Sequence, residues 1–257
     1  GSTADPLCAG ELRDALANRE ISVVAQPKLD LATRRVVGAE ILARWIHPTR
    51  GFIPPDRFVA LAEASGQVGA LTELVLDKAL DWYRDSPLRE FGTVAVNLST
   101  SCLADVGLAD RVQAACRSRL VAPGQLILEI TESSAMDRTA DTFDTLTRLR
   151  LKGFHLSVDD FGTGYSSLAQ LARLPLSEVK IDKSFVIAMP TSSDARKIVD
   201  AILNLAQAME LRCVAEGVED GEVLETLAAL GCQQAQGYHI SRPMPGPEFD
   251  AWLSRPA

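Results

Sequence analysis

The stretch Ser157–Leu168 reads Ser-Val-Asp-Asp-Phe-Gly-Thr-Gly-Tyr-Ser-Ser-Leu, and the rest of the chain is organised around it. The apolar run 154–158 predicts a short buried strand that ends at the adjacent carboxylates Asp159 and Asp160. Neighbouring carboxylates repel each other and are hard to keep ionised together without a cation. Gly162 and Gly164 then allow a backbone that takes positive φ or moves. The stretch predicts metal chemistry at a strand end, and an ordinary polar turn is the alternative.

Apolar runs alternate with segments of helical periodicity along the chain. We predict strands at residues 21–26, 36–44, 93–98, 125–131, 154–158, 178–181, 211–215 and 233–236. From the third strand onward each is followed by a helix, among them 107–120, 139–151, 166–173 and 194–209, which is typical of parallel strands covered by helices. The polar turn 30–35 is too short for a crossover, so the first two strands must be antiparallel neighbours.

These elements predict an α/β fold, a modified (β/α)₈ TIM-like barrel with one antiparallel strand near the N-terminus. A doubly wound open sheet is the alternative, but no Gly-x-Gly-x-x-Gly follows the first strand. The length of 257 residues allows one large domain or two small ones. We expect residues 1–5 to be a disordered tag remnant and residues 6–257 to form a single barrel domain.

Composition excludes several classes of protein. The net charge of −8 disfavours binding to long nucleic acid, and no apolar run approaches the length of a membrane span. Five dispersed cysteines without a Cys-x-x-Cys pair argue against a disulfide framework and a zinc site, and they fit a reducing cytoplasm. We therefore expect a cytoplasmic protein, or the cytoplasmic domain of a larger one.

Nearly every predicted strand carries an ionisable or amide residue within or just after its apolar run. These residues are Glu40, Arg44, Asn97, Glu129, Glu132, Asp159, Asp160, Lys180, Glu216, Glu219 and Gln236. Each one alone could be a turn residue or a salt-bridged strand residue, but in a barrel they converge at the C-terminal mouth. So many carboxylates need cations, and oxygen ligands without a histidine cluster favour Mg²⁺ or Mn²⁺ over Zn²⁺. We interpret Trp45 and Tyr238 as packing residues, and base stacking with a guanine is the alternative for either.

At this point the motifs resemble the EAL-domain family, bacterial phosphodiesterases that hydrolyse the second messenger cyclic di-GMP. Residues 40–44, Glu-Ile-Leu-Ala-Arg, look like the family signature, and residues 159–164, Asp-Asp-Phe-Gly-Thr-Gly, match its mobile sixth loop. The resemblance runs from Gln26-Pro27-Lys28 to Ser241-Arg242-Pro243. It implies a (β/α)₈ barrel with an antiparallel strand at its start, in agreement with the hairpin above. Ile41 stands where Ala or Val is commoner, and strand alternation should point it away from the mouth.

The resemblance also implies roles for individual residues. One metal ion would be bound by Glu40, Asn97, Glu129 and Asp159. Asp159 would also bridge to a second ion, which Asp160 binds as well. Glu216 would be either a metal ligand or the general base. Lys180 would hold an activating water or the phosphate, so the catalytic set is Glu40, Lys180 and Glu216. Glu132, Gly162, Gly164 and Glu219 would position the sixth loop, and the substrate would meet Gln26, Leu42, Arg44 and Gln236.

The resulting hypothesis is hydrolysis of cyclic di-GMP to linear 5′-pGpG through activation of water by two metal ions. A catalytically silent cyclic di-GMP receptor is the alternative, and a phosphodiesterase for another nucleotide is a third, because no residue pattern here reads the base. Family resemblance also implies a homodimer and regulatory domains outside this sequence.

Overall fold

The computed structural model describes residues 7–135, 139–164 and 171–255. The strands are β1 (Ile21–Asp30), β2 (Val36–His47), β3 (Gly51–Ile53), β4 (Thr93–Asn97), β5 (Leu126–Thr131), β6 (His155–Phe161), β7 (Glu178–Ile181), β8 (Arg212–Ala215) and β9 (Gln234–Ala235). The helices are α1 (Ala9–Ala17), α2 (Pro55–Ala64), α3 (Val68–Asp85), α4 (Thr100–Leu103), α5 (Leu108–Ser118), α6 (Glu132–Ala135), α7 (Ala140–Leu151), α9 (Lys183–Ala188), α10 (Ser193–Ala208), α11 (Gly221–Ala229) and α12 (Gly246–Leu253). Two 3₁₀ turns, η1 (Pro87–Glu90) and η2 (Pro123–Gln125), precede β4 and β5.

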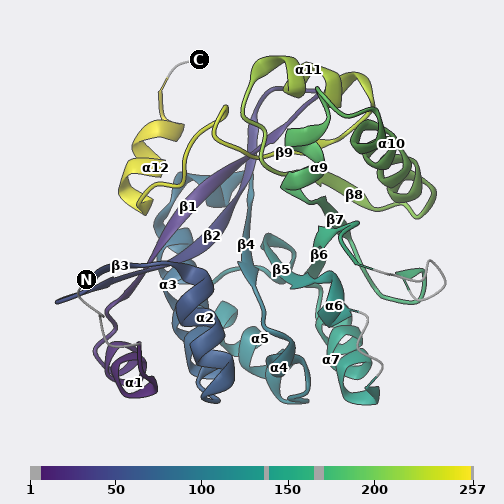
Figure 1. Cartoon of the computed structure of the whole chain (residues 1–257). Helices are drawn as coiled ribbons and strands as arrows, with labels where there is room; N and C mark the ends of the chain where they lie inside the picture. The colour runs from purple at the N-terminus through teal and green to yellow at the C-terminus, as the bar shows by residue number, and fades with distance from the viewer. Residues whose placement is uncertain (1–6, 136–138, 165–170, 256–257) are drawn as a thin grey trace.

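The strands form one sheet in the order β1-β9-β8-β7-β6-β5-β4-β2-β3, and a further pairing of β1 with β2 closes it into a barrel (Figure 1). β1 is antiparallel to both of its neighbours, β2 and β9, whereas the other pairs around the ring are parallel. The predicted modified barrel and its antiparallel hairpin are confirmed. β3, which pairs with the end of β2, was not predicted because three residues carry too little pattern.

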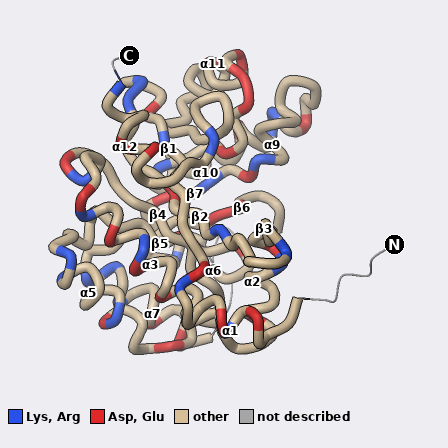
Figure 2. The backbone as a smooth tube through the Cα atoms, turned by 90° about the vertical axis from the view of Figure 1, so that its left-hand side faces the viewer, with Lys and Arg blue, Asp and Glu red and all other residues tan. Residues whose placement is uncertain are grey.

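Helix ends follow local sequence chemistry. The side chains of Ser192 and Asp220 accept hydrogen bonds from backbone amides of the first turns of α10 and α11, as N-cap residues do. Gly231 follows α11 with φ of 85°, the left-handed conformation that ends many helices. The outer helices and loops carry charges of both signs, spread around the molecule (Figure 2).

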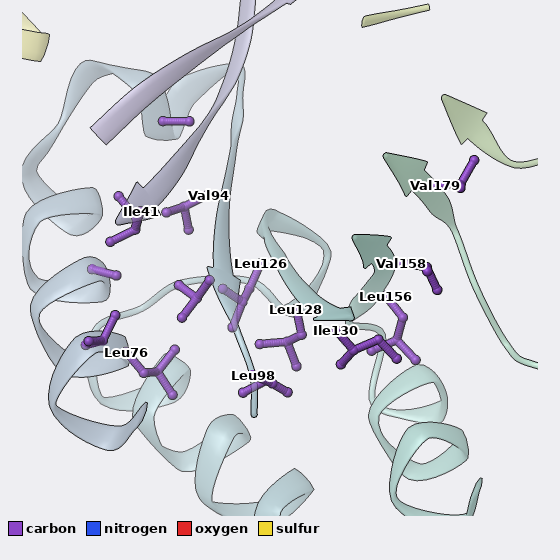
Figure 3. Packing of buried hydrophobic residues seen from close by; sticks show 14 of the residues in the cluster. Ile41, Leu76, Val94, Leu98, Leu126, Leu128, Ile130, Leu156, Val158 and Val179 are labelled. Atoms are coloured by element: carbon purple, nitrogen blue, oxygen red, sulfur yellow. The ribbon is translucent and has the colours of Figure 1, made fainter. Parts of the chain in front are cut away.

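The core lies between the sheet and the helices, because alternate strand residues face outward. Figure 3 shows Leu126, Leu128 and Ile130 of β5 beside the apolar residues of neighbouring strands, with Leu76 of α3 among them. All four side chains are buried. The intervening residues of each strand therefore face the barrel interior, and there the polar residues gather. Within the described residues, no helix is both long and apolar enough to cross a membrane.

Several boundaries differ from those predicted. β6 continues to Phe161, so Asp159 and Asp160 lie within the strand instead of after its end. β1 continues to Asp30 and thus includes Lys28. The short helices α4, α6 and α9 were not predicted. The expected tag remnant at 1–5 and most of the expected helix 166–173 lie outside the described residues.

Candidate active site

Lys180 of β7 stands at the centre of the site. Its side chain is fully buried, and its Nζ lies within ion-pair distance of four carboxylates. The distances are 2.8 Å to Glu216, 3.0 Å to Glu129, 3.1 Å to Glu40 and 3.2 Å to Asp159. Burial alone would lower the pKa of this lysine, but the surrounding carboxylates raise it well above its ordinary value. Lys180 is therefore a permanent cation at the barrel mouth.

The carboxylates fall into two groups that share Asp159. One group is Glu40, Glu129 and Asp159, the other is Asp159, Asp160 and Glu216, and in each the ligand oxygens lie within 4.8 Å of one another. Both groups have the size and the oxygen donors that suit a hard divalent cation. The side-chain amide of Asn97 joins the first group, since its Nδ2 donates to Glu40 at 3.0 Å.

Crowding of these acids changes their protonation. Burial, reinforced by the charge of Glu40, raises the pKa of Glu129 to about 7. Burial also raises the pKa of Glu216 to about 8. Lys180 lowers this pKa, whereas the negative charges of Asp159 and Glu40 raise it further. Burial would raise the pKa of Glu40 as well, but Lys180 and Lys28 hold it at about 2. Lys180 alone does not balance the four carboxylates around it, and the donor set fits bound metal ions.

Two glutamines border the carboxylates. Gln236 is buried, and its Nε2 donates to Glu40 at 2.6 Å and to Glu216 at 2.8 Å. Gln26 of β1 pairs in register with Glu40, and its amide donates to the carbonyl of Ser241 at 3.3 Å. Both glutamines lie in the wall of the same cleft as Glu40.

The segment that follows Asp160 is tied to Glu132. The Glu132 carboxylate accepts hydrogen bonds from the backbone amides of Gly162 at 3.0 Å and Gly164 at 3.2 Å. Gly162 has φ of 101°, which strains any other residue, and a Cβ there would also lie only 3.0 Å from the side chains of Phe185 and Ile202. A Cβ on Gly164 would approach the Glu132 carboxylate to 3.0 Å. The positive φ that the sequence allowed is present at Gly162, whereas Gly164 is not among the described glycines with positive φ and instead packs closely against Glu132.

Two clefts meet at the carboxylates. One, of about 380 Å³, is lined by Gln26, Glu40, Leu42, Asp160, Lys183, Ile187, Glu216, Gly217, Glu219, Gln236, Gly237 and Tyr238. The other, of about 460 Å³, runs between β2 and helices α2 and α3, and its wall includes Arg44, Asn97 and Asp159. Leu42 and Asp160 line both clefts. The site is thus open on either side of the carboxylate cluster.

The predicted site residues lie around the two clefts, but two predictions need comment, those for Glu219 and Tyr238. Glu219 is exposed in the first cleft, and in the described ranges no hydrogen bond links it to residues 159–164. Tyr238 is not a packing residue, because it is 53% exposed and stacks against Arg242, whose guanidinium carbon lies 4.3 Å from the ring centre. Trp45, in contrast, is fully buried against Phe58, as predicted.

Sequence reasoning missed two buried charged residues, Lys28 and Glu178. Lys28 Nζ lies 2.7 Å from Glu129 and 3.4 Å from Glu178, and both Lys28 and Glu178 are 1% exposed. Spacing could have indicated them, since each stands two residues from a predicted site residue, Gln26 or Lys180, on the same face of its strand. Lys183, which lines the first cleft, was also missed.

Comparisons with known proteins show what this chain is similar to. The model of a protein family, the EAL domain, matches residues 9–243. The cyclic di-GMP phosphodiesterase NbdA of Pseudomonas aeruginosa is 44% identical over 245 residues, which are 95% of this chain and 31% of NbdA. The cyclic di-GMP phosphodiesterase RocR of the same organism is 37% identical over 237 residues, 91% of this chain and 60% of RocR. The solved structure of the PaMucR phosphodiesterase in complex with c-di-GMP superposes with a TM-score of 0.88 at 41% identity, covering 93% of this chain and 98% of that one.

Proposed function

This chain belongs to the EAL domain family, and we propose that it hydrolyses one phosphodiester bond of cyclic di-GMP to give linear 5′-pGpG. The observation that carries the proposal is the pair of carboxylate groups sharing Asp159, with Lys180 between them at the barrel mouth. Relatives that are named cyclic di-GMP phosphodiesterases, NbdA and RocR, support the choice of substrate. The chain spans less than two thirds of either relative, so the activity is proposed for the matched region.

Two divalent ions, Mg²⁺ or Mn²⁺, would be held by the carboxylate groups. Glu40, Asn97, Glu129 and Asp159 would hold one ion, and Asp159, Asp160 and Glu216 the other. Such a pair supplies a water of lowered pKa and neutralises charge on the phosphate. Water adds at phosphorus, the bond from phosphorus to the 3′ oxygen breaks, and that oxygen leaves with a proton.

The protein's own groups would act beside the phosphate. Lys180 is placed to offset the negative charge that grows on the phosphate oxygens as water attacks, because its Nζ already lies among the carboxylates. Glu216 shares its carboxylate with Lys180 and Gln236, which suits either a ligand or a general base for the attacking water. Gln236 orients both Glu40 and Glu216 through its two hydrogen bonds.

The two clefts suit a dinucleotide. A substrate with its scissile phosphate at the carboxylates would place one nucleoside in each cleft, with Leu42 between them. Arg44 would then meet the nucleotide in the second cleft and Gln26 in the first. The exposed ring of Tyr238, which lines the first cleft and stacks against Arg242, offers a surface against which a base would lie.

Segment 159–164 would close over the phosphate from one side. Glu132 positions it through the amides of Gly162 and Gly164. Glu219 lines the first cleft, and we propose that it helps to position segment 159–164 when substrate is bound.

The decisive test is nucleotide chromatography after incubation of the purified protein with cyclic di-GMP in Mg²⁺, Mn²⁺ or EDTA. We expect pGpG with either metal and none in EDTA. A Glu40→Gln variant should give no pGpG, whereas Glu225→Gln, at an exposed ion pair with Arg34, should match the parent. Tight binding of cyclic di-GMP without product in any metal would contradict hydrolysis and identify a receptor instead.

We also propose a homodimer that works in the cytoplasm beside regulatory domains. NbdA and RocR both extend well beyond the region that this chain matches, which supports the presence of further domains. Light scattering coupled to size-exclusion chromatography tests the dimer directly, and a monomer at all concentrations would contradict it.

A further inference from the structure

A second layer of charge lies inside the barrel, beneath the mouth. Lys28 stands two residues beyond Gln26 on β1, so both side chains face the interior. Because β1 runs antiparallel, Lys28 lies deeper: Gln26 pairs with Glu40, and Lys28 pairs with Gly38. On β7, Glu178 precedes Lys180 by two residues and likewise lies below it on the same face.

Glu129 joins the two layers. Its Oε1 lies 2.7 Å from Lys28 Nζ below, and its Oε2 lies 3.0 Å from Lys180 Nζ at the mouth. All three side chains are at most 1% exposed. The two oxygens of one carboxylate thus point to different layers, and each is held by its own ammonium group.

Lys28 is itself fixed from below. Glu178 accepts from Lys28 at 3.4 Å through Oε1, and its Oε2 lies 3.5 Å from Arg212 Nη1. Two explanations of Lys28 follow from this arrangement. It could merely neutralise the buried Glu178, or it could act on Glu129, to which it lies closer.

We propose that Lys28 is a positioning residue that holds Oε1 of Glu129 and so keeps Oε2 directed at the carboxylates of the mouth. The inference rests on the metal site of the proposed function. A buried group that binds the outer oxygen of a metal-ligating carboxylate fixes the orientation of the ligand, and loss of such partners typically weakens metal binding about 10- to 100-fold. The shorter contact to Glu129 favours this role over neutralisation of Glu178.

The test compares Lys28→Met, Glu178→Gln and the double variant by calorimetric titration with Mn²⁺, without nucleotide, and by thermal unfolding. For Lys28→Met we expect an Mn²⁺ dissociation constant raised about 10- to 100-fold and a lower unfolding midpoint. The double variant also removes the Glu178 charge, which without Lys28 would keep only the 3.5 Å contact to Arg212. Its midpoint should therefore return toward that of the parent while the dissociation constant stays raised. Glu178→Gln alone should bind Mn²⁺ nearly as the parent does.

Lys152→Met is the matched control, because it removes a lysine paired with Asp110 at 2.7 Å on the outside of the barrel. Its Mn²⁺ binding should equal that of the parent. Parent-like Mn²⁺ binding by Lys28→Met, or by the double variant, would overturn the inference, and the double variant decides alone if the single variant fails to fold. A parent that binds no Mn²⁺ would overturn the metal site and the inference together. A parent that binds Mn²⁺ but yields no pGpG would overturn only the proposed hydrolysis.

Discussion

The ion pairs outside the barrel and those inside it have similar lengths and different consequences. Outside, Arg119 lies 2.7 Å from Asp81 and 2.9 Å from Asp77, and the two aspartates are 48% and 38% exposed. Inside, Lys180 lies 2.8 Å from Glu216 with none of its side chain exposed. Distance therefore does not distinguish the two regions, but access to water does. Exposed pairs contribute about 0–1 kcal/mol, whereas removal of one partner of a buried pair costs about 3–5 kcal/mol.

The difference also indicates what each region is for. A buried ion pair rarely stabilises a protein more than apolar residues of the same size would, because both ions lose their hydration. A cluster in which burial and mutual repulsion raise the pKa of Glu129 and Glu216 is therefore costly, and such clusters are concentrated at functional sites. The ion pairs on the outer helices keep their contact with water, so they lack this desolvation cost and do not indicate a functional site.

The largest effect should come from Lys180→Met. Without its ammonium group the four facing carboxylates lose their shared cation, and we expect hydrolysis to fall at least about 100-fold. Steady-state rates with cyclic di-GMP check this. Lys197→Met, which removes a lysine that is 75% exposed, should keep the parent rate. Equal rates of hydrolysis for both variants would contradict the conclusion that the interior lysine matters for activity and the exterior one does not.

Added metal ions should stabilise the folded protein by binding the carboxylates inside the barrel, and the exterior ion pairs should not contribute to this effect. Ligand binding at 100 times the dissociation constant raises the free energy of unfolding by about 2.7 kcal/mol per site. Asp159→Asn should abolish most of this gain, because Asp159 belongs to both carboxylate groups. Denaturant unfolding with Mn²⁺ and with EDTA measures the gain, and Asp77→Asn on α3 should retain it in full. A persistent gain in Asp159→Asn would place the metal elsewhere.

Glu132→Gln should have an intermediate effect. The carboxylate accepts from the amides of Gly162 and Gly164, and hydrogen bonds to charged groups contribute about 1.5–3 kcal/mol. We expect kcat to fall about tenfold while calorimetric Mn²⁺ binding stays unchanged, since Glu132 positions the segment without belonging to either carboxylate group. Glu73→Gln on the outside of α3 is the control. Loss of Mn²⁺ binding together with kcat would instead make Glu132 part of the metal site.

The smallest effect should come from Arg119→Met. Although two ion pairs are lost, we expect stability to change by less than about 1 kcal/mol, and the change should vanish in 1 M salt. Urea unfolding at low and high salt measures this difference, and the rate of hydrolysis should not respond. A salt-independent loss of several kcal/mol would show that exterior pairs matter as much as interior ones.

Much of this architecture could be predicted because the signals are local. The short turn between β1 and β2 required an antiparallel hairpin, and strand alternation placed Ile41 in the core and Glu40 at the mouth. The positive φ at Gly162 also followed from the local sequence, because glycine adopts it without strain. Prediction was weaker for the solvent exposure of single side chains, because exposure depends on contacts between distant segments. Tyr238, for example, was predicted to be a packing residue and instead faces the cleft.

The sequence by itself determined the barrel, its antiparallel strand and the acidic residues at the strand ends, because hydrophobic periodicity and loop length are properties of neighbouring residues. Only the tertiary structure decided which charges meet. Lys28 reaches Glu129 across 101 residues of chain and Glu178 across 150, and no local pattern records such a contact. Closure of the barrel brings these strands together, and the exclusion of water inside it turns ordinary lysines and glutamates into one coupled cluster.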